Sequence, residues 1–170
     1  MDSTRSIPQS LPQGALQDAR ALDPLFLALG GSGEIGMNVN LYGCQGKWIM
    51  VDLGMTFADP YYPGVDLVFA DLSFIEERLD DLLGVVLTHA HEDHIGALGL
   101  LWPRLKAPLY ATPFTAFLIR EKLRDAGLEG EVPMTEVPLG GKIKLGPFEI
   151  DLLTLTQPQI IESIHREYLQ

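Results

Sequence analysis

A dense group of possible metal ligands follows directly after an apolar segment in the middle of the chain. Residues 82–87 read LLGVVL, and the next residues are Thr88-His89-Ala90-His91-Glu92-Asp93-His94. An apolar run bounded by polar residues is typical of a buried strand, which we expect over residues 84–88. Alternate side chains of an extended segment point to one face, so His89 and His91 can share one metal ion. The run therefore predicts a metal site at the end of a buried strand.

Asp93 and His94 predict a second metal position beside the first. Where the chain turns after the strand, these two side chains become neighbours on a different side, and a carboxylate beside an imidazole suits a divalent ion. Asp93 can also hold or deprotonate a water that the metals activate. The alternative is a polar surface loop that holds three of the four histidines in the chain. A lone His-x-His would be weak evidence, but the full pattern after an apolar strand favours a dinuclear site.

The segment from Thr88 to Ala97 resembles the signature of the metallo-β-lactamase superfamily of hydrolases. Further segments are similar to bacterial ribonuclease J, a family within that superfamily. They are LGGSGEIGMN at 29–38, MVDLGMTF at 50–57, PGVD at 63–66, LWP at 101–103 and YATPF at 110–114. The resemblance extends from about Leu25 to about Thr156, which is most of the chain.

The resemblance implies an α/β fold of the metallo-β-lactamase-like αββα layered type, with only the first half of that fold in this chain. It assigns residues 23–156 to the N-terminal part of such a domain. Residues 1–22 are then a mobile polar leader, and residues 157–170 a divergent tail with helical spacing. Ribonuclease J proteins are two-zinc enzymes that process and degrade RNA as 5′-3′ exonucleases and endonucleases. Their longer chains have further domains, and the resemblance implies homo-oligomers for these full-length relatives.

The same resemblance implies roles for five residues. His89 and His91 would bind one zinc ion, Asp93 and His94 the other, and Asp52 would orient the ligands from behind, so that Asp93 and Asp52 are the catalytic candidates. A histidine, a bridging aspartate and a last histidine are expected downstream. The family continues after a strand like 153–156 with His-Ser-Ile-Pro, whereas this chain continues with Gln157-Pro158-Gln159. The only later histidine, His165, fits a solvated helix position better than a ligand.

The chain is therefore expected to be a truncated or frame-shifted ribonuclease J whose second zinc site is left short of ligands. Two alternatives stay open. One is a non-catalytic remnant that binds a metal or a partner, because zinc usually takes three or four protein ligands. The other is a different hydrolase of the same superfamily, since the metal motif is shared by several reactions.

Charge and composition bear on the substrate and the compartment. The net charge is −11, and the sequence has no basic patch of the kind expected in a protein that binds a polyanion. The small clusters Arg104/Lys106 and Arg120/Lys122/Arg124 are interpreted as solvated faces, so RNA is implied by the resemblance alone. The single cysteine, Cys44, cannot form an internal disulfide and is not expected to be a zinc ligand. No segment reaches the roughly 18 apolar residues of a membrane helix, and a cytoplasmic protein without membrane contact is expected.

Periodicity and turn residues predict strands before and after the helices, which suits a sheet covered by helices. Strands are expected at 25–29, 39–42, 47–52, 84–88, 109–111, 132–137, 142–145 and 148–154. Helices are expected at 71–82 with Ser73 as cap, at 95–102 ended by Pro103, and from Thr112-Pro113 to near Gly127.

The segment Gly31-Ser32-Gly33-Glu34-Ile35-Gly36 satisfies the G-x-G-x-x-G pattern of dinucleotide-binding folds, with Asp52 about 20 residues further on. That pattern requires a helix after the third glycine, yet residues 37–42 alternate with period two. We interpret the glycines as turns that let strands approach the metal cleft. With Asn38, the same turn can also help line a phosphate site.

Overall fold

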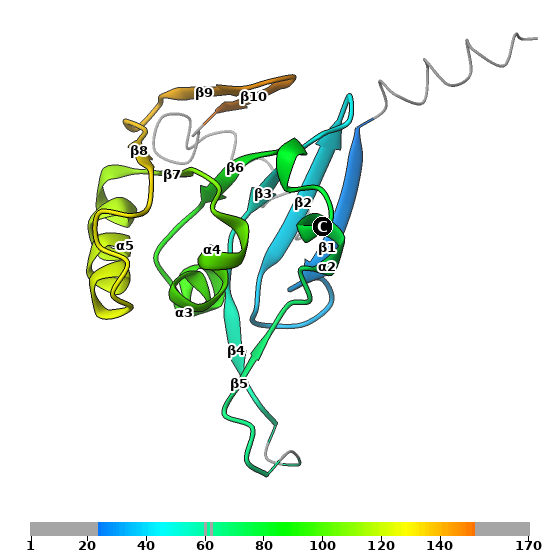
Figure 1. Ribbon diagram of the computed structural model, residues 1–170, viewed down its shortest axis with the longest axis vertical. Coiled ribbons are helices and arrows are strands. Elements are labelled where there is room, and N and C mark those ends of the chain that lie inside the picture. Colours follow the sequence, from blue (N-terminus) through cyan, green and yellow to red (C-terminus); the bar gives the residue numbers. More distant parts are fainter. Residues whose placement is uncertain (1–23, 60, 62, 152–170) are drawn as a thin grey trace, which may run out of the picture.

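The computed structural model describes residues 24–59, 61 and 63–151 (Figure 1). The predictions for the leader 1–22, for the tail 157–170 and for His165 lie outside the described residues.

A six-stranded mixed sheet forms the centre of the structure. Its strand order is β1-β2-β3-β6-β7-β8. The first three strands are antiparallel, and β3, β6, β7 and β8 run parallel to one another. The strands are β1 (Leu25–Gly30), β2 (Val39–Cys44), β3 (Lys47–Val51), β6 (Leu82–Leu87), β7 (Leu109–Ala111) and β8 (Met134–Glu136). Parallel strands need crossover connections, and the connections here carry the helices.

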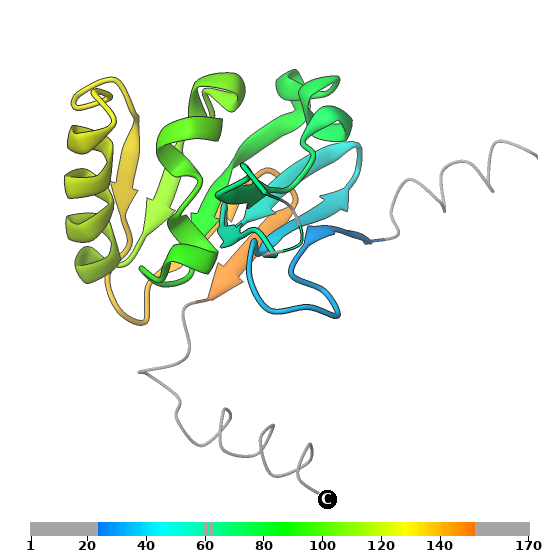
Figure 2. The same ribbon diagram turned by 90° about the horizontal axis from the view of Figure 1, so that it is seen from below.

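The helices cover one face of this sheet (Figure 2). They are α2 (Ser73–Glu76), the 3-10 turn η1 (Leu79–Asp81), α3 (Glu92–Ile95), α4 (Leu98–Leu105) and α5 (Pro113–Asp125). Val85 and Leu87 of β6 join Leu98 and Ile119 of the helices in the main core. Because side chains alternate along a strand, Val86 faces the other side of the sheet.

A hairpin covers part of that other side. It consists of β9 (Lys142–Leu145) and β10 (Phe148–Asp151), drawn in orange behind the sheet in Figure 2. Val86, Val137 and Ile143 form a second, smaller core between the sheet and the hairpin. The predicted α/β layering is confirmed, because a helical layer, a central sheet and a strand pair on the opposite face follow one another.

A protruding hairpin was not predicted from the sequence. It consists of β4 (Met55–Phe57) and β5 (Leu67–Phe69) and extends from one end of the sheet (Figure 1). Each strand has only three residues, and the connection contains Pro63 and Gly64. Three residues are too few for a period-two pattern to identify a strand by itself, although the equally short β7 was expected at its observed bounds.

The expected helix 71–82 is wrong in its length and in its cap. The chain is α-helical only over α2 and then forms the 3-10 turn η1, because Arg78 between them adopts φ −136° and its guanidinium donates to the carbonyl oxygen of Phe74 at 2.7 Å. Ser73 makes no side-chain cap. Its backbone N–H instead donates to the carboxylate of Asp71 at 2.9 Å. Two hydrogen bonds lower the pKa of Asp71 from its ordinary value. The bond from the Ser73 backbone N–H has the largest effect, and the bond from the Ser73 side chain has the next largest.

Pro103 does not end its helix, as the sequence predicted, but lies inside α4. A proline gives up one backbone hydrogen bond, and the buried side chains of Trp102 and Leu105 on either side offset that loss by packing in the core. The helix ends where Lys106 adopts a left-handed φ of 50° and donates its N–H to the carbonyl of Trp102. Among the described helices, none is long and apolar enough to cross a membrane.

Candidate metal centre

The carboxyl ends of two neighbouring parallel strands form the floor of the site. Val51 of β3 pairs with Val86 of β6, so the residues that follow, Asp52 and Thr88, meet at the same edge of the sheet. The N–H of Asp52 donates to the carbonyl of Val86 at 3.0 Å. Side chains that converge at the carboxyl ends of parallel strands are a common basis for ligand sites in open α/β sheets.

Asp52 is the buried acceptor at this edge, with 3% of its surface exposed. Its carboxylate accepts the backbone N–H of Thr88 at 2.8 Å and the Thr88 hydroxyl at 2.9 Å. The imidazole Nδ1 of His94 lies 2.7 Å from Asp52 Oδ2, the same oxygen that accepts the Thr88 hydroxyl at 2.9 Å. Asp52 has a left-handed φ of 65°, which aspartate tolerates better than most residues. A buried carboxylate bonded in this way holds a partner ring in one orientation.

Backbone hydrogen bonds join residues 88–95, here called the donor loop, to the strand ends. The last part of this segment is the short helix α3, which carries Asp93 and His94. Leu53 N–H donates to the carbonyl of His94 at 2.7 Å, and Asn38 N–H donates to the carbonyl of Asp93 at 2.8 Å. Gly54 lies directly against this loop, because a Cβ atom there would be 1.8 Å from the carbonyl oxygen of Asp93. The donor loop is therefore held by the segment after β3 and by the segment before β2.

Asp93 and His94 form the first donor pair, with Asp93 Oδ2 3.3 Å from His94 Nε2. If His94 donates its Nδ1–H to Asp52, the lone pair of Nε2 is the one directed toward Asp93. That nitrogen and a carboxylate oxygen are donors that a divalent ion accepts. The side-chain amide of Asn38 lies beside both, 3.2 Å from each of these two atoms.

His89 and His91 form the second donor pair, with His89 Nε2 3.2 Å from His91 Nδ1. The ring of His89 also lies against that of His94, at 3.9 Å between centroids. The pKa of His89 is lowered from its ordinary value, first by loss of hydration and then by the neighbouring rings of His94 and His91. A histidine that resists protonation keeps its lone pair for a metal.

The structure brings together all five residues named from the sequence: Asp52, His89, His91, Asp93 and His94. Imidazole nitrogens and carboxylate oxygens are donors that suit a divalent metal, and here they form two adjacent pairs. Across residues 24–59, 61 and 63–151, however, no three histidine, cysteine, aspartate or glutamate side chains form a group that could hold an ion. Each pair would therefore need further ligands to complete a site, and the assigned roles stay a prediction.

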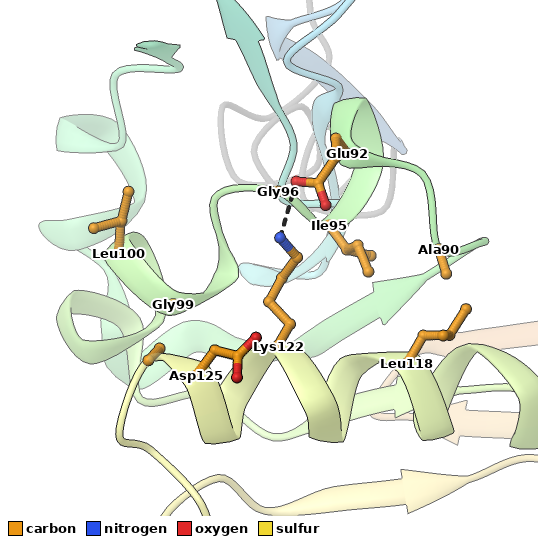
Figure 3. A pocket seen from close by; sticks show the side chains of 10 residues that line it. Ala90, Glu92, Ile95, Gly96, Gly99, Leu100, Leu118, Lys122 and Asp125 are labelled. Carbon is orange, nitrogen blue, oxygen red and sulfur yellow. Dashed lines mark hydrogen bonds and ion pairs between the residues drawn. The ribbon is translucent and has the colours of Figure 1, made fainter. Parts of the chain in front are cut away.

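A cavity of about 560 Å³ lies beside the donor loop, between α3, α4 and α5 (Figure 3). The ammonium of Lys122 on α5 lies 2.9 Å from the carboxylate of Glu92. In the sequence, Glu92 stands between the two donor pairs. Ala90 and Glu92 line the cavity, whereas none of the four predicted donors does. It is therefore a neighbour of the site rather than part of it.

Thr88 is the contributor for which sequence reasoning assigned no role. A hydroxyl residue between a buried strand and the first histidine was the only signal for it. Cys44 lies in β2, with its thiol free. Most of the basic residues in the two clusters are paired with glutamates, which supports their interpretation as solvated faces. The pairs are Arg104–Glu76, Arg120–Glu136, Lys122–Glu92 and Arg124–Glu121.

Comparison with known proteins gives one family match and several relatives. Residues 35–158 match the model of the metallo-beta-lactamase superfamily. Ribonuclease J of Sinorhizobium meliloti is 48% identical over 131 residues, covering 75% of this chain and 23% of the relative. Ribonuclease J of Mycolicibacterium smegmatis is 47% identical over 103 residues, which cover 60% of this chain and 18% of the relative. The chain thus spans less than a quarter of these relatives, and the predicted resemblance to ribonuclease J is confirmed.

Among solved structures, the Rm3 metallo-beta-lactamase is 19% identical, with a TM-score of 0.49 over 77% of this chain and 51% of that one.

Proposed function

The chain belongs to the metallo-beta-lactamase superfamily, and from this premise we propose that it supplies the metal-binding strand ends of a hydrolase that cleaves RNA phosphodiester bonds. The observation that carries the proposal is the contact of the buried Asp52 carboxylate with His94 Nδ1 at 2.7 Å. This contact leaves Nε2 beside Asp93, in the arrangement in which a carboxylate behind a histidine prepares it as a metal ligand.

Four side chains would hold the metal ions. His89 and His91 would hold one and Asp93 and His94 the other, and we propose zinc in both positions. Bound divalent ions supply Lewis acidity for the phosphoryl oxygens and lower the pKa of a water molecule. Asp52 keeps the His94 ring in one orientation. Asp93 would also be the group that accepts a proton from that water.

RNA is proposed as the substrate because the relatives that match most of this chain are named ribonuclease J. The net charge of −11 does not favour a polyanion by itself, but bound metal ions would attract phosphate locally. We extend the proposal to 5′-3′ exonuclease and endonuclease activity in the cytoplasm, in RNA processing and decay.

A second candidate is a chain that binds metal without catalysis. The two separate donor pairs favour it, because in the described part of the chain no third donor joins either pair. Zinc held by two protein ligands is weakly bound.

Metal content separates these candidates first. The purified chain is analysed for metal beside a variant with both His89→Ala and His91→Ala, with His165→Ala as a control that removes a histidine outside the run. Close to two zinc ions per chain, lost in the double variant and kept in the control, supports the metal centre. Zinc well below one per chain in the parent contradicts it for this chain.

Substrate tests then distinguish the hydrolases. The zinc-loaded chain is offered 5′-labelled single-stranded RNA, the same sequence as DNA, and a chromogenic β-lactam. Cleavage of RNA that disappears in the double variant supports the ribonuclease. Turnover of the β-lactam alone identifies a different hydrolase of the superfamily, and a metal-loaded chain without any turnover favours the non-catalytic candidate.

A further inference from the structure

We infer that Asn38 is a positioning residue, which holds the Asp93 carboxylate in place for the metal. This inference rests on the proposed function, and it assigns a role to the glycine-rich segment that resembles a dinucleotide-binding motif.

The backbone of Asn38 is fixed between the two parts of the site. Its N–H donates to the carbonyl of Asp93 at 2.8 Å, and its own carbonyl accepts the N–H of Gly54 at 3.0 Å. One bond leads to the donor loop and the other to the residues after β3. A side chain substitution leaves both of these bonds available, so its effect can be separated from that of the backbone.

The side-chain amide is directed at the Asp93–His94 pair. Its nitrogen Nδ2 lies 3.1 Å from the carbonyl oxygen of Asp93, 3.2 Å from Asp93 Oδ2 and 3.2 Å from His94 Nε2. All three are acceptors when His94 carries its proton on Nδ1, as its contact with Asp52 requires. An amide group has two hydrogens to donate and no charge to place beside a metal ion. Asn38 therefore approaches the pair as a donor rather than as a ligand.

Asp52 and Asn38 each hold one member of the pair. Asp52 orients the His94 ring through Nδ1. In the metal-free chain Asn38 also lies beside Nε2, and a metal ion on that nitrogen would replace this contact. Asn38 also bonds only one carboxylate oxygen of Asp93, so the other oxygen stays available to an ion. Both side chains of the donor pair are thus held by groups that are not ligands.

Gly31 makes room for this amide. It has a left-handed φ of 82°, and a Cβ atom there would lie 2.3 Å from Asn38 Oδ1 and 2.9 Å from Asn38 Cα. A larger residue would displace Asn38 from the donor pair. The first glycine of the G-x-G-x-x-G segment is therefore explained by packing against Asn38, and not by an approach to a dinucleotide.

Cobalt(II) titration of the full chain tests the inference. Cobalt replaces zinc with an absorption spectrum that reports its ligands. Asn38→Leu keeps the size of the side chain and removes the donor. Asn40→Leu is the matched control, because it removes a half-buried amide two residues further on, in β2. Its oxygen has no hydrogen-bond partner among the described residues.

Asn38→Leu is expected to weaken cobalt binding about 10- to 100-fold, with Asn40→Leu within twofold of the parent. Unchanged binding in Asn38→Leu overturns the inference. So does an equal loss of binding in both variants, because that would mark a general effect of losing an amide from this strand region.

A metal-free measurement keeps the inference separate from the proposed function. In imidazole ¹⁵N spectra without metal, Asn38→Leu is expected to shift the Nε2 resonance of His94, and Asn40→Leu is not. A His94 resonance that does not move in Asn38→Leu overturns the inference whatever the titration shows. If the parent binds no cobalt while the His94 shift is present, the positioning contact is supported and the proposed metal function fails.

Discussion

The two donor pairs differ in how the rest of the chain holds them. Asp93 and His94 are held by Asp52, by Asn38 and by backbone bonds from two strand ends. The contacts found for His89 and His91 are with each other, with Thr88 and with the ring of His94.

This difference shows that one half of the candidate site is prepared by the sheet before any metal binds. A prepared site loses little side-chain entropy on binding. The His89–His91 pair follows directly from the end of β6 and has fewer supports of this kind. We therefore expect changes near the Asp93–His94 pair to affect both folding and metal binding, and changes near the other pair to affect mainly metal binding.

The largest expected effect comes from Gly54→Ala. The added methyl group would lie 1.8 Å from the carbonyl oxygen of Asp93, so either the donor loop or the segment after β3 must move. A loss of about 3 kcal/mol or more in the free energy of unfolding is expected, with loss of metal at the Asp93–His94 pair. Urea denaturation measures the first and cobalt titration the second.

Gly46→Ala is the control for this change. Gly46 also has a positive φ, of 74°, but no heavy atom lies within 4 Å of an added Cβ. It is expected to cost only about 1 kcal/mol, from backbone strain. Equal losses in the two variants would contradict the view that the donor loop is packed against the segment after β3.

Asp52→Asn is expected to have the next largest effect. Asparagine keeps the shape and tolerates the left-handed backbone, but it removes the charge that accepts bonds from Thr88 and His94. A loss of about 2–3 kcal/mol is expected in urea denaturation. Asp81→Asn, which breaks an exposed pair with Lys47, should cost below about 1 kcal/mol. A similar cost for both would show that Asp52 does not support the Asp93–His94 pair.

His89 is expected to make a smaller contribution to the free energy of unfolding, and this contribution depends on pH. The folded chain lowers the pKa of His89 below its ordinary value of 6.5. On acidification the unfolded chain therefore takes up this proton first, and the free energy of unfolding of metal-free protein falls as pH drops below about 6.5. Stability above that pH is unaffected by this group. His89→Ala should flatten the fall, measured by urea denaturation from pH 7.5 to 5, and an unchanged slope would refute the assignment.

Lys122→Met should have the smallest effect. It removes the partly exposed pair with Glu92 across the cavity beside the site, which contributes about 0.5 kcal/mol or less. Metal affinity is expected to stay within twofold of the parent by cobalt titration, as in the matched variant Glu92→Gln. A large loss of metal affinity in Lys122→Met or Glu92→Gln would show that contacts with α5, and not those with the segment after β3, hold the donor loop in place.

Sequence reasoning identified the donor run and the strand before it because both depend on local patterns. An apolar run followed by closely spaced histidines can be recognised without knowing what lies opposite. The partnership of Asp52 with His94 joins residues 42 positions apart, and it depends on β3 and β6 being neighbours. Only the family resemblance, and not periodicity, indicated that Asp52 supports the site.

The failures have equally physical causes. Strands β4 and β5 are too short to show a period, and the helix expected over 71–82 is interrupted by the contact of Arg78 with Phe74. Pro103 is tolerated because the packing of Trp102 and Leu105 outweighs one lost backbone bond. The pairing of β4 with β5 and the core packing around Pro103 depend on tertiary contacts that the local sequence pattern does not contain. The Arg78–Phe74 contact is local, since it spans only four residues, but no periodicity indicates it.

The backbone bonds from Asn38 and Leu53 to the donor loop also determine how this loop opens. Leu53 in turn accepts the N–H of Ala97 at 3.1 Å, so the chain is joined to the segment after β3 both within α3 and directly after it. A segment joined in this way belongs to the same cooperative unfolding unit as the strands it bonds. Amide hydrogens of Asn38, Leu53 and Ala97 should then exchange with solvent as slowly as those of β3 and β6, unlike those of an ordinary surface loop.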